Sequence, residues 1–246
     1  MTVIVTWKQP GISMGELAKV YHNAAPLTYA GRLDPLAEGV CLLLSGSDRH
    51  RKEQFLGLDK EYTVDVLFGV GTDTHDPLGI ITQYSPRQVA EKDIRDALPS
   101  FSPSYNQIPP AYSSQPIDGE AAFVHARRGG VPNLQARSIS IAANIISHTS
   151  LPATMILADA TKRINLVHGD FRQKEITASW ESTLIDPIAP LTACRLQVTC
   201  TSGGYMRSLA RDLGERLNTS AIAYRIVRTR VGHFQLPIPA ELQKSY

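Results

Sequence analysis

The sequence predicts an α+β fold built on a mixed, mostly antiparallel sheet that is flanked by helices. With 246 residues and 43% hydrophobic side chains, the chain can bury a sizeable core. Stretches with the alternation of β-strands recur along its length, and helical stretches lie between some of them. Because strands and helices do not alternate one by one, a doubly wound parallel sheet is not indicated.

The first third of the chain predicts strands that surround one well-capped helix. Ser13 is a suitable N-cap and Glu16 stands three residues later, which is the spacing of a capping box. In chain order, the expected elements are a strand at 3–7, a helix ending near 23, a loop at 29–35, a strand at 40–44, a helix at 48–56, a strand at 62–68 and a glycine-rich loop to 79.

The rest of the chain predicts a second group of strands and helices within one domain, 1–246. Ala90, Ile94 and Leu98 share one helical face, which predicts a helix that covers the sheet. In chain order, we expect a helix at 87–98, an extended segment at 109–110, a short helix at 119–128, several strand-like runs in 138–179, a surface excursion at 182–190, a strand at 195–201, a helix at 205–217 and a strand at 227–234.

The charge of the chain permits a nucleic-acid partner without requiring one. The net charge is +2 and the pI is about 8.4. Three basic clusters fit a phosphate backbone contacted at several points, although from charge alone solvated faces explain them better. The clusters are Arg49, Arg51 and Lys52, then Arg127 and Arg128, then Arg225, Arg228 and Arg230.

The cysteines and the apolar runs predict a cytoplasmic protein. Cys41, Cys194 and Cys200 form no C-x-x-C pair, so neither a disulfide framework nor a cysteine zinc site is indicated. No apolar run approaches the roughly 20 residues that span a bilayer, and the first residues lack the basic start of a signal peptide.

The most informative stretch reads G-R-L-D-P-L-A-E-G-V at residues 31–40. Because the residue before a proline avoids the helical region, Asp34 is presented on an extended or turn-like loop just before a buried strand. An Asp-Pro pair between glycines is usually just a turn. Taken alone, the pair therefore does not distinguish a turn from a mounted nucleophile.

This stretch closely resembles the active-site motif G-x-L-D-P-x-A-x-G of the TruB family of pseudouridine synthases. Further stretches resemble the family's motifs in the same order, with K-E-Y at 60–62, C-T-S-G-G-Y-M-R at 200–207 and I-V-R-T-R-V-G-H-F at 226–234. The resemblance implies the pseudouridine synthase fold. It also implies an isomerase that converts uridine in RNA to pseudouridine without a metal or an organic cofactor.

The resemblance assigns three catalytic residues. Asp34 would be the nucleophile, which attacks the ribose C1′ or the uracil ring as a carboxylate. Tyr62 would stack on the flipped base, and its hydroxyl would assist removal of the C5 proton. Arg207 would pair with Asp34 through charge-assisted hydrogen bonds and orient it.

The resemblance also assigns residues that bind the substrate. Ile226 would support the base, and the stretches 107–114 and 126–129 would flank a thumb-like insertion at about 101–137 that grips the RNA. The expected binding residues are Tyr29, Gly31, Arg32, Leu33, Lys60, Tyr205, Ile226, Arg127, Arg128 and Arg228. The implied partner is tRNA, bound by a monomer at the T arm through its shape, with the uridine numbered 55 flipped from its stack.

Several positions depart from the family's pattern. Tyr29 stands where histidine is usual, Ser202 where lysine is usual and Gly204 where threonine is usual. A segment at about 148–191 is longer than the family normally has, and we assign it no function. The chain stops soon after residue 234 without the PUA-type RNA-binding domain of many members, so a minimal catalytic core is expected.

Two other functions fit parts of the sequence. The three departures would suit an RNA-binding or tRNA-folding protein that has lost turnover, although the retained catalytic residues argue against it. Asp73, His75 and Asp76 offer oxygen and imidazole ligands for a metal-dependent hydrolase. The TruB family has a similar loop that serves structure and RNA approach. A chelator would distinguish the hydrolase from the isomerase, which should be indifferent to it.

Overall fold

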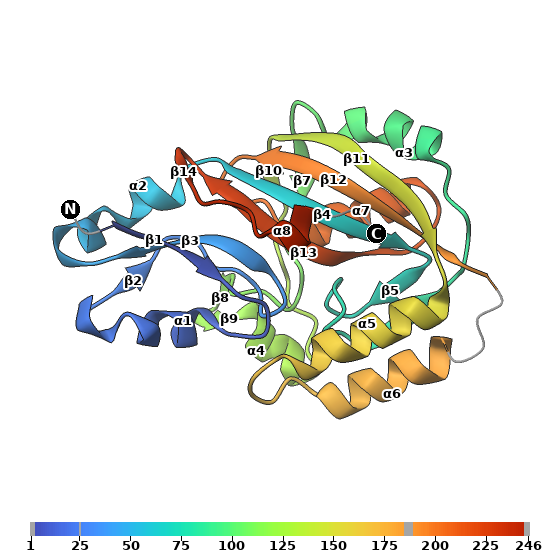
Figure 1. The fold of residues 1–246 in the computed structure, drawn as a ribbon, viewed down its shortest axis with the longest axis horizontal. Coiled ribbons are helices and arrows are strands. Elements are labelled where there is room, and N and C mark those ends of the chain that lie inside the picture. The colour runs from blue at the N-terminus through green and yellow to red at the C-terminus, as the bar shows by residue number, and fades with distance from the viewer. Residues whose placement is uncertain (1–2, 25, 185–188, 244–246) are drawn as a thin grey trace.

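The computed structural model describes residues 3–24, 26–184 and 189–243 (Figure 1). Its strands are β1 (Val3–Lys8), β2 (Thr28–Tyr29), β3 (Glu38–Leu44), β4 (Lys60–Phe68), β5 (Val70–Thr72), β6 (Ile81–Tyr84), β7 (Tyr105–Gln107), β8 (Pro116–Ile117), β9 (Glu120–Ala121), β10 (Arg137–Ile139), β11 (Ile141–Leu151), β12 (Leu191–Cys200), β13 (Ala221–Val231) and β14 (Phe234–Gln235). Its helices are α1 (Met14–Val20), α2 (Lys52–Leu56), α3 (Glu91–Ala97), α4 (Ala122–Arg127), α5 (Ala153–Asn165), α6 (Gln173–Leu184), α7 (Met206–Arg216) and α8 (Ala240–Gln243), with 3₁₀ turns at His22–Ala24, Gly46–Arg51 and Leu98–Phe101.

One large sheet organises the molecule. Its strand order is β1-β3-β13-β4-β12-β11, with β2 beside β3 and β14 beside β13. Strands β3 and β13 run parallel, and the other pairs run antiparallel. The predicted α+β class with a mixed, mostly antiparallel sheet is therefore confirmed. The parallel pair is important for the site, because it brings the start of β3 beside the middle of β13.

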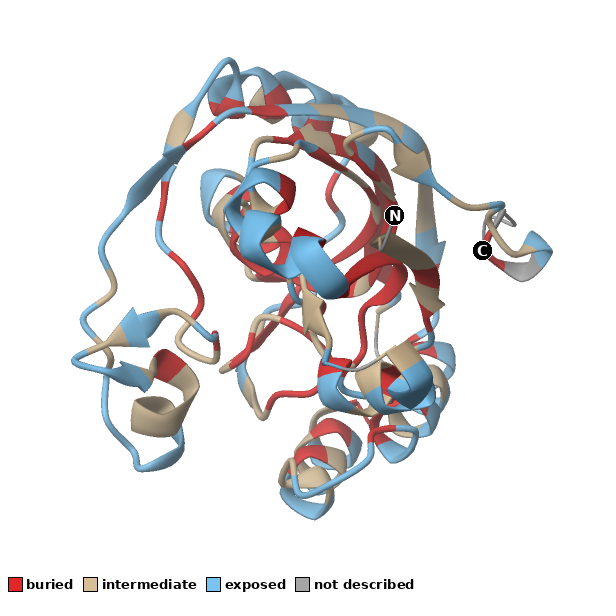
Figure 2. Ribbon diagram, turned by 90° about the vertical axis from the view of Figure 1, so that its left-hand side faces the viewer, coloured by how far each residue is buried: buried red, intermediate tan, exposed pale blue. Residues whose placement is uncertain are grey.

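Strand β4 separates two apolar layers because its side chains alternate between the faces of the sheet. On one face Tyr62 and the alternate residues after it pack with α3 and α7, and on the other face Leu67 packs with α5 and α6. Figure 2 shows that buried residues line the sheet and the inner sides of these helices, whose outer sides are exposed.

The helix α1 follows its sequence prediction closely. The Oγ of Ser13 accepts from the backbone N–H of Glu16 at 3.1 Å, and the Glu16 carboxylate accepts from the backbone N–H of Ser13 at 2.7 Å. The predicted capping box is therefore present. It fixes where α1 begins, at the edge of the loop that joins β1 to α1.

Several strand-like runs were expected in 138–179, and this prediction was wrong after β11. After β11 the chain forms the helices α5 and α6, which pack against each other and on the sheet. Ala153, Ile156, Ala160 and Ile164 make the buried stripe of α5, at helical spacing. Packing of this stripe on the sheet outweighs the strand preference of the β-branched residues nearby.

The last predicted strand was also placed too late. Strand β13 begins at Ala221, and the turn at Gly232, where φ is 57°, separates it from the short β14. The first residues of β13 include two alanines, which have a low preference for strands, but they pair with β4 and are buried. The predicted surface excursion at 182–190 falls partly on 185–188, which lie outside the described residues.

The segment between β7 and β10 projects from the body of the molecule. These two strands pair with each other, and the residues between them carry the β8–β9 hairpin and α4 at the end of two extended stretches (Figure 2). In the described part of the chain, no helix combines the length and the apolar character that crossing a bilayer requires.

The α5–α6 hairpin should be a major source of stability. Trp180 is fully buried and its indole N–H donates to the carbonyl of Gly79 at 3.1 Å. We expect Trp180→Ala to lower the free energy of unfolding by about 3–5 kcal/mol. Met155, which is 56% exposed on the same hairpin, supplies the matched control Met155→Ala. Urea unfolding of both variants gives their free energies of unfolding. Equal small losses of this free energy in the two variants would contradict the role of Trp180 in stability.

Candidate active site

A buried lysine, Lys8, binds backbone carbonyls of the loop that carries Asp34. Lys8 is fully buried at the end of β1, and its Nζ donates to the carbonyls of Pro35 at 3.0 Å, Ala37 at 2.7 Å and Gln9 at 3.1 Å. Burial lowers the pKa of Lys8 to about 8, partly offset by Cys41, Asp34 and Glu38 nearby. The lysine thus fixes the backbone on the C-terminal side of Asp34.

The same loop is held from the other side by Arg228, which is also almost completely buried. Its guanidinium donates to the carbonyls of Val40 at 2.7 Å, Arg32 at 3.3 Å and Gly31 at 3.4 Å. Gly39 lets β3 approach β13 closely here, because it has a φ of 120° and a Cβ at this position would lie 2.2 Å from the Arg228 carbonyl oxygen.

Arg207 grips Asp34 in a bidentate ion pair at the base of a pocket. Nε and Nη2 of Arg207 donate to the two carboxylate oxygens of Asp34 at 2.8 Å each. The Arg207 side chain is 3% exposed, whereas the Asp34 side chain is 35% exposed. The arginine therefore orients the carboxylate and leaves part of it open to the pocket.

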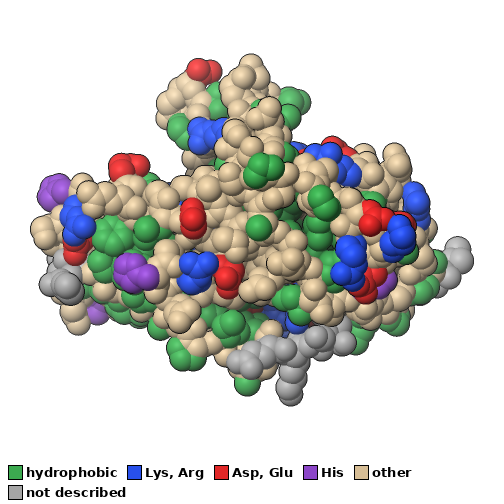
Figure 3. Space-filling model, turned by 90° about the horizontal axis from the view of Figure 1, so that it is seen from above, with side chains coloured by type: hydrophobic (Ala, Val, Ile, Leu, Met, Phe, Trp, Pro, Cys, Tyr) green, Lys and Arg blue, Asp and Glu red, His purple; other side chains and the backbone are tan. Residues whose placement is uncertain are grey.

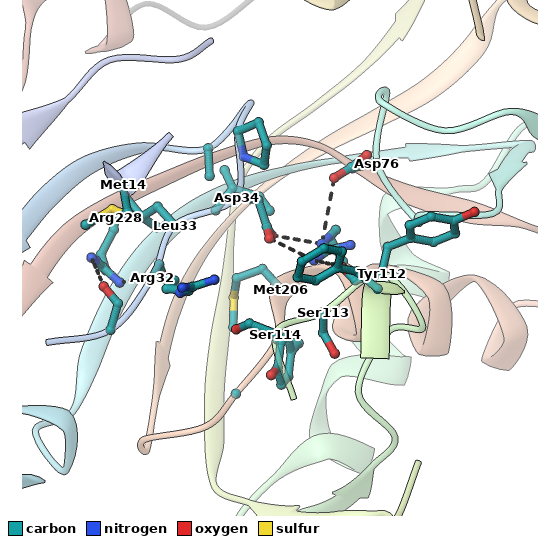
Figure 4. Close-up of a pocket in the computed structure, with 18 of the residues that line it drawn as sticks. Met14, Arg32, Leu33, Asp34, Asp76, Tyr112, Ser113, Ser114, Met206 and Arg228 are labelled. Atoms are coloured by element: carbon teal, nitrogen blue, oxygen red, sulfur yellow. Dashed lines mark hydrogen bonds and ion pairs between the residues drawn. The ribbon is translucent and has the colours of Figure 1, made fainter. Parts of the chain in front are cut away.

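Two further donors of Arg207 are used by backbone carbonyls. Its Nη1 donates to Thr74 at 2.9 Å and its Nη2 to Tyr112 at 3.0 Å. A second carboxylate, that of Asp76, lies 3.7 Å from Nε. Figure 4 shows Asp34, Asp76 and Tyr112 around this point, with dashed lines converging from both carboxylates.

The three residues considered as metal ligands have other partners. Asp76 accepts from the Thr74 hydroxyl at 2.7 Å, and Asp73 pairs with Arg172 at 2.9 Å. Burial lowers the pKa of His75 to about 4 and raises the pKa of Asp76 to about 6. Among the residues that the structure describes, no group of three His, Cys, Asp or Glu side chains could hold a metal ion.

Tyr62 and Ile226 form a nearly buried apolar wall beside Asp34. They stand on the neighbouring strands β4 and β13 and are each 7% exposed. Burial raises the pKa of the Tyr62 hydroxyl to about 12, and this hydroxyl is hydrogen-bonded to Arg228. At neutral pH the phenol is thus protonated, which suits it to stacking more directly than to acting as a free base.

A cavity of about 800 Å³ connects most of the expected site residues. It is lined by Asp34, Tyr62 and Arg207 and by Tyr29, Gly31, Arg32, Leu33, Lys60, Arg127, Tyr205, Ile226 and Arg228. Arg128 does not line it and instead pairs with Glu120 at 2.8 Å. Twelve of the thirteen expected site residues therefore line one cavity, because the four motifs lie on segments that the fold brings together.

Two of the lining cations are committed to the protein backbone. Lys60 is buried, its Nζ donates to the carbonyls of Leu56 and Leu58, and burial lowers its pKa to about 8. Arg228 has the carbonyl partners described above. These two residues shape the pocket wall rather than offering free charge to a phosphate.

The C-terminal basic cluster is not an open phosphate-binding patch, which corrects one interpretation of the charge pattern. Arg225 pairs with the buried Glu38 at 3.2 Å, Arg230 pairs with Glu61 at 3.5 Å, and Arg228 is buried. The position of these arginines in the sequence did not show that the neighbouring strands β3 and β4 carry the carboxylates that pair with Arg225 and Arg230.

Opposite charges also lie side by side on the exposed side of α3, where Lys and Arg are next to Asp and Glu (Figure 3).

The three departures have local explanations. The hydroxyl of Tyr29 accepts from Arg32 at 2.7 Å, and the guanidinium lies over its ring. Ser202 donates to the carbonyl of Leu56 at 2.6 Å. At Gly204 a Cβ would lie 3.0 Å from the Sγ of Cys200, so a larger residue requires this neighbour to shift.

Sequence reasoning did not assign several residues that complete the site. Tyr112 occurs in a recognised motif, but the motif did not reveal that its backbone carbonyl contacts Arg207. Asp76 was considered for a metal rather than for that arginine. Phe171 and Arg172 enter the pocket wall from the loop between α5 and α6, in the segment without an assigned function, and nothing in the sequence pattern pointed to them.

The comparisons with known proteins agree with this geometry. Residues 19–171, more than half of the chain, match the family model described as TruB family pseudouridylate synthase, N-terminal domain. The chain belongs to the TruB family. The match includes Asp34 and Tyr62, and it ends within the loop between α5 and α6.

Relatives in the TruB family are similar over most of this chain. The chain is 31% identical to tRNA pseudouridine synthase B of Thermus thermophilus, over 85% of its own length and 64% of that protein. It is 31% identical to the protein of the same name from Bacteroides thetaiotaomicron, over 85% of its own length and 72% of that protein. The chain thus spans less than two thirds of the length of the Thermus protein.

Solved structures show the same fold. A chain of a Cbf5-Nop10-Gar1 complex superposes with a TM-score of 0.59 at 17% identity, covering 96% of this chain and 50% of that one. A chain of an H/ACA RNP bound to a substrate RNA containing 2′-deoxyuridine gives a TM-score of 0.53 at 17% identity, covering 96% and 49%. This similarity confirms the predicted pseudouridine synthase fold.

The buried Lys8 predicts a particular pH dependence of stability. Its pKa is about 8 in the folded chain and 10.5 as the ordinary value, so the unfolded chain binds more protons between these pH values. Stability should therefore rise from pH 8 to 10.5 because of this group. We expect wild type to gain stability relative to Lys8→Met over this range in denaturant unfolding. A constant difference between the two proteins would refute the assignment.

Proposed function

We propose that this chain converts uridine to pseudouridine in tRNA, at the T-loop uridine numbered 55. The observation that carries the proposal is the bidentate pair of Arg207 and Asp34, which presents a partly open carboxylate beside the apolar wall of Tyr62 and Ile226. The curated relatives named tRNA pseudouridine synthase B support the substrate class.

In the proposed reaction, Asp34 acts as the nucleophile on a uridine flipped into the pocket. The Asp34 carboxylate forms a bond to the ribose C1′ or to the uracil ring, and this bond breaks again before the product leaves, so the carboxylate is regenerated. Meanwhile the N1–C1′ bond breaks, the uracil turns, and a C5–C1′ bond forms. The C5 proton passes to solvent water and N1 takes one proton from solvent water, so the product is an isomer of the substrate. Arg207 keeps the carboxylate aimed at the base throughout, because both of its oxygens are held.

The pocket walls have separate tasks in this proposal. Tyr62 and Ile226 stack against the uracil and offset the few kcal/mol that base flipping requires. Tyr205 borders the same space, and its backbone is held by Gln107, which donates to its carbonyl at 3.0 Å and accepts from its N–H at 2.7 Å. Arg127 contacts the RNA from the projecting segment, which is the thumb-like insertion at about 101–137.

The proposal includes the setting in which the chain acts. One catalytic domain, 1–246, binds the T arm of tRNA as a monomer in the cytoplasm. The chemistry uses the carboxylate and the base itself, so activity requires neither a metal nor an organic cofactor. A chelator should leave the rate unchanged.

The nucleophile is tested with Asp34→Asn. We expect the variant to lose at least about 10³-fold in rate while it still binds tRNA, because the change removes the carboxylate and its pairing with Arg207 but keeps the size of the side chain. An unmodified tRNA transcript is incubated in parallel with and without chelator, and pseudouridine is mapped by carbodiimide treatment and primer extension. Asp93→Asn, an exposed change on α3, is the matched control.

The outcomes of this test separate the candidate functions. A stop at the T-loop uridine with wild type and Asp93→Asn, but not with Asp34→Asn, supports the proposal. Binding of tRNA without any modification would favour an RNA-binding or tRNA-folding protein instead. Activity that vanishes in chelator would favour a metal-dependent enzyme.

Asp76 predicts an acid limit to the reaction. Its pKa is raised to about 6 by burial, so it loses its charge beside Arg207 as the pH falls through this value. We expect kcat of wild type to fall below about pH 6, because Arg207 then loses one of the two carboxylates that position it. Asp76→Asn should show a lower plateau without this limb. Identical profile shapes for the two proteins would refute the role.

A further inference from the structure

The loop between α5 and α6, residues 166–172, contacts three of the segments near the nucleophile, through Gly11, Asp73 and Tyr112. The backbone N–H of His168 donates to the carbonyl of Gly11 at 3.0 Å, and the N–H of Gly11 donates to the carbonyl of Pro35 at 2.9 Å. Pro35 directly follows Asp34. This first route connects the loop to the nucleophile through backbone groups alone.

Arg172 provides a second route, which ends at Arg207. Its Nη1 lies 2.9 Å from the carboxylate of Asp73, and its guanidinium lies over the ring of Tyr112 at 4.9 Å from the centroid. The Tyr112 hydroxyl also hydrogen-bonds to Asp73, so the three side chains close a ring of contacts. Each member therefore restrains the other two.

Tyr112 transmits this restraint to the catalytic pair. Its carbonyl accepts one hydrogen of Arg207 Nη2, and the other hydrogen of the same nitrogen goes to Asp34. If Tyr112 moves, Nη2 loses one of its two acceptors, and the guanidinium is held only by Asp34 and the Thr74 carbonyl. The angle at which Arg207 presents Asp34 then becomes less defined.

The backbone of Arg172 shows that its placement is enforced. Its φ is 61°, in the left-handed region that residues other than glycine rarely adopt. Its N–H donates to the Asp170 carboxylate at 3.2 Å, which helps to retain this conformation. The side chain is 32% exposed, so it can be changed without opening the core.

We propose that Arg172 is a positioning residue for the Arg207–Asp34 pair, acting through Asp73 and Tyr112 from the α5–α6 loop. The segment that contains this loop had no function assigned from the sequence. The inference rests on the proposed pseudouridine synthase activity for its kinetic test. It identifies the helical hairpin as a support of the active site as well as of the fold.

The kinetic test compares Arg172→Ala, Arg172→Lys and the control Lys174→Ala. Lys174 is exposed, lies two residues away and does not line the pocket, so Lys174→Ala removes one positive charge without changing the pocket wall. Release of tritium from C5-labelled uridine in a tRNA transcript gives kcat and KM, and filter binding gives the Kd. We expect Arg172→Ala to lower kcat about tenfold or more while KM and Kd change less than about twofold.

The conservative variant separates positioning from simple structural support. Arg172→Lys keeps the ion pair with Asp73 but loses the planar stack on Tyr112, so it should restore kcat only in part. Arg172→Ala and Asp73→Asn should be less than additive in kcat, because both break the same ring of contacts. Additive losses would overturn the proposal.

Further outcomes would also overturn it. If Arg172→Ala raises KM and Kd but leaves kcat unchanged, Arg172 binds RNA. If Arg172→Ala and Lys174→Ala have the same kcat, KM and Kd, Arg172 has no role in positioning. Hydrogen exchange of residues 110–115 gives a readout without activity, and we expect faster exchange in Arg172→Ala than in Lys174→Ala. Inactive wild type with this faster exchange would refute the proposed function but leave the positioning contact supported.

Discussion

The active site depends on the burial of one guanidinium. Arg207 is 3% exposed, and a buried cation without partners is very costly, so its donors must be satisfied by the protein. Asp34, the carbonyl of Thr74 and the carbonyl of Tyr112 accept hydrogen bonds from four of its five N–H donors. These partners come from three separate loops, which consequently meet at one point. The ion pair therefore organises the loops as well as orienting the nucleophile.

Two further buried cations define the loop on which Asp34 lies. Lys8 and Arg228 together bind carbonyls on both sides of Asp34, including those of Arg32 and Pro35. Backbone carbonyls do not titrate, so these hydrogen bonds do not depend on the protonation state of the acceptor. Because the loop is held at several points, Asp34 can approach the uracil in one defined geometry.

The sequence predicted the parts of this site that depend on local patterns, and missed those that depend on tertiary contacts. Asp34, Tyr62 and Arg207 stand in extended motifs, and the strands that bring them together follow from alternation. The contact of Arg172 with Tyr112 joins segments far apart in the chain, and no local pattern marks it. The strand assignment after β11 failed for the same reason, because packing on the sheet determines α5.

The charges that build the site also oppose the stability of the fold. Burial raises the pKa of Asp76 to about 6, so its charged form destabilises the folded chain above that pH. Burial lowers the pKa of Lys8 to about 8, so its charged form destabilises the folded chain below that pH. Between these values both costs are present together, and in the same range both groups carry the charges that position Arg207 and the Asp34 loop. The apolar layers on the two faces of the sheet must therefore supply the stability that the site itself does not.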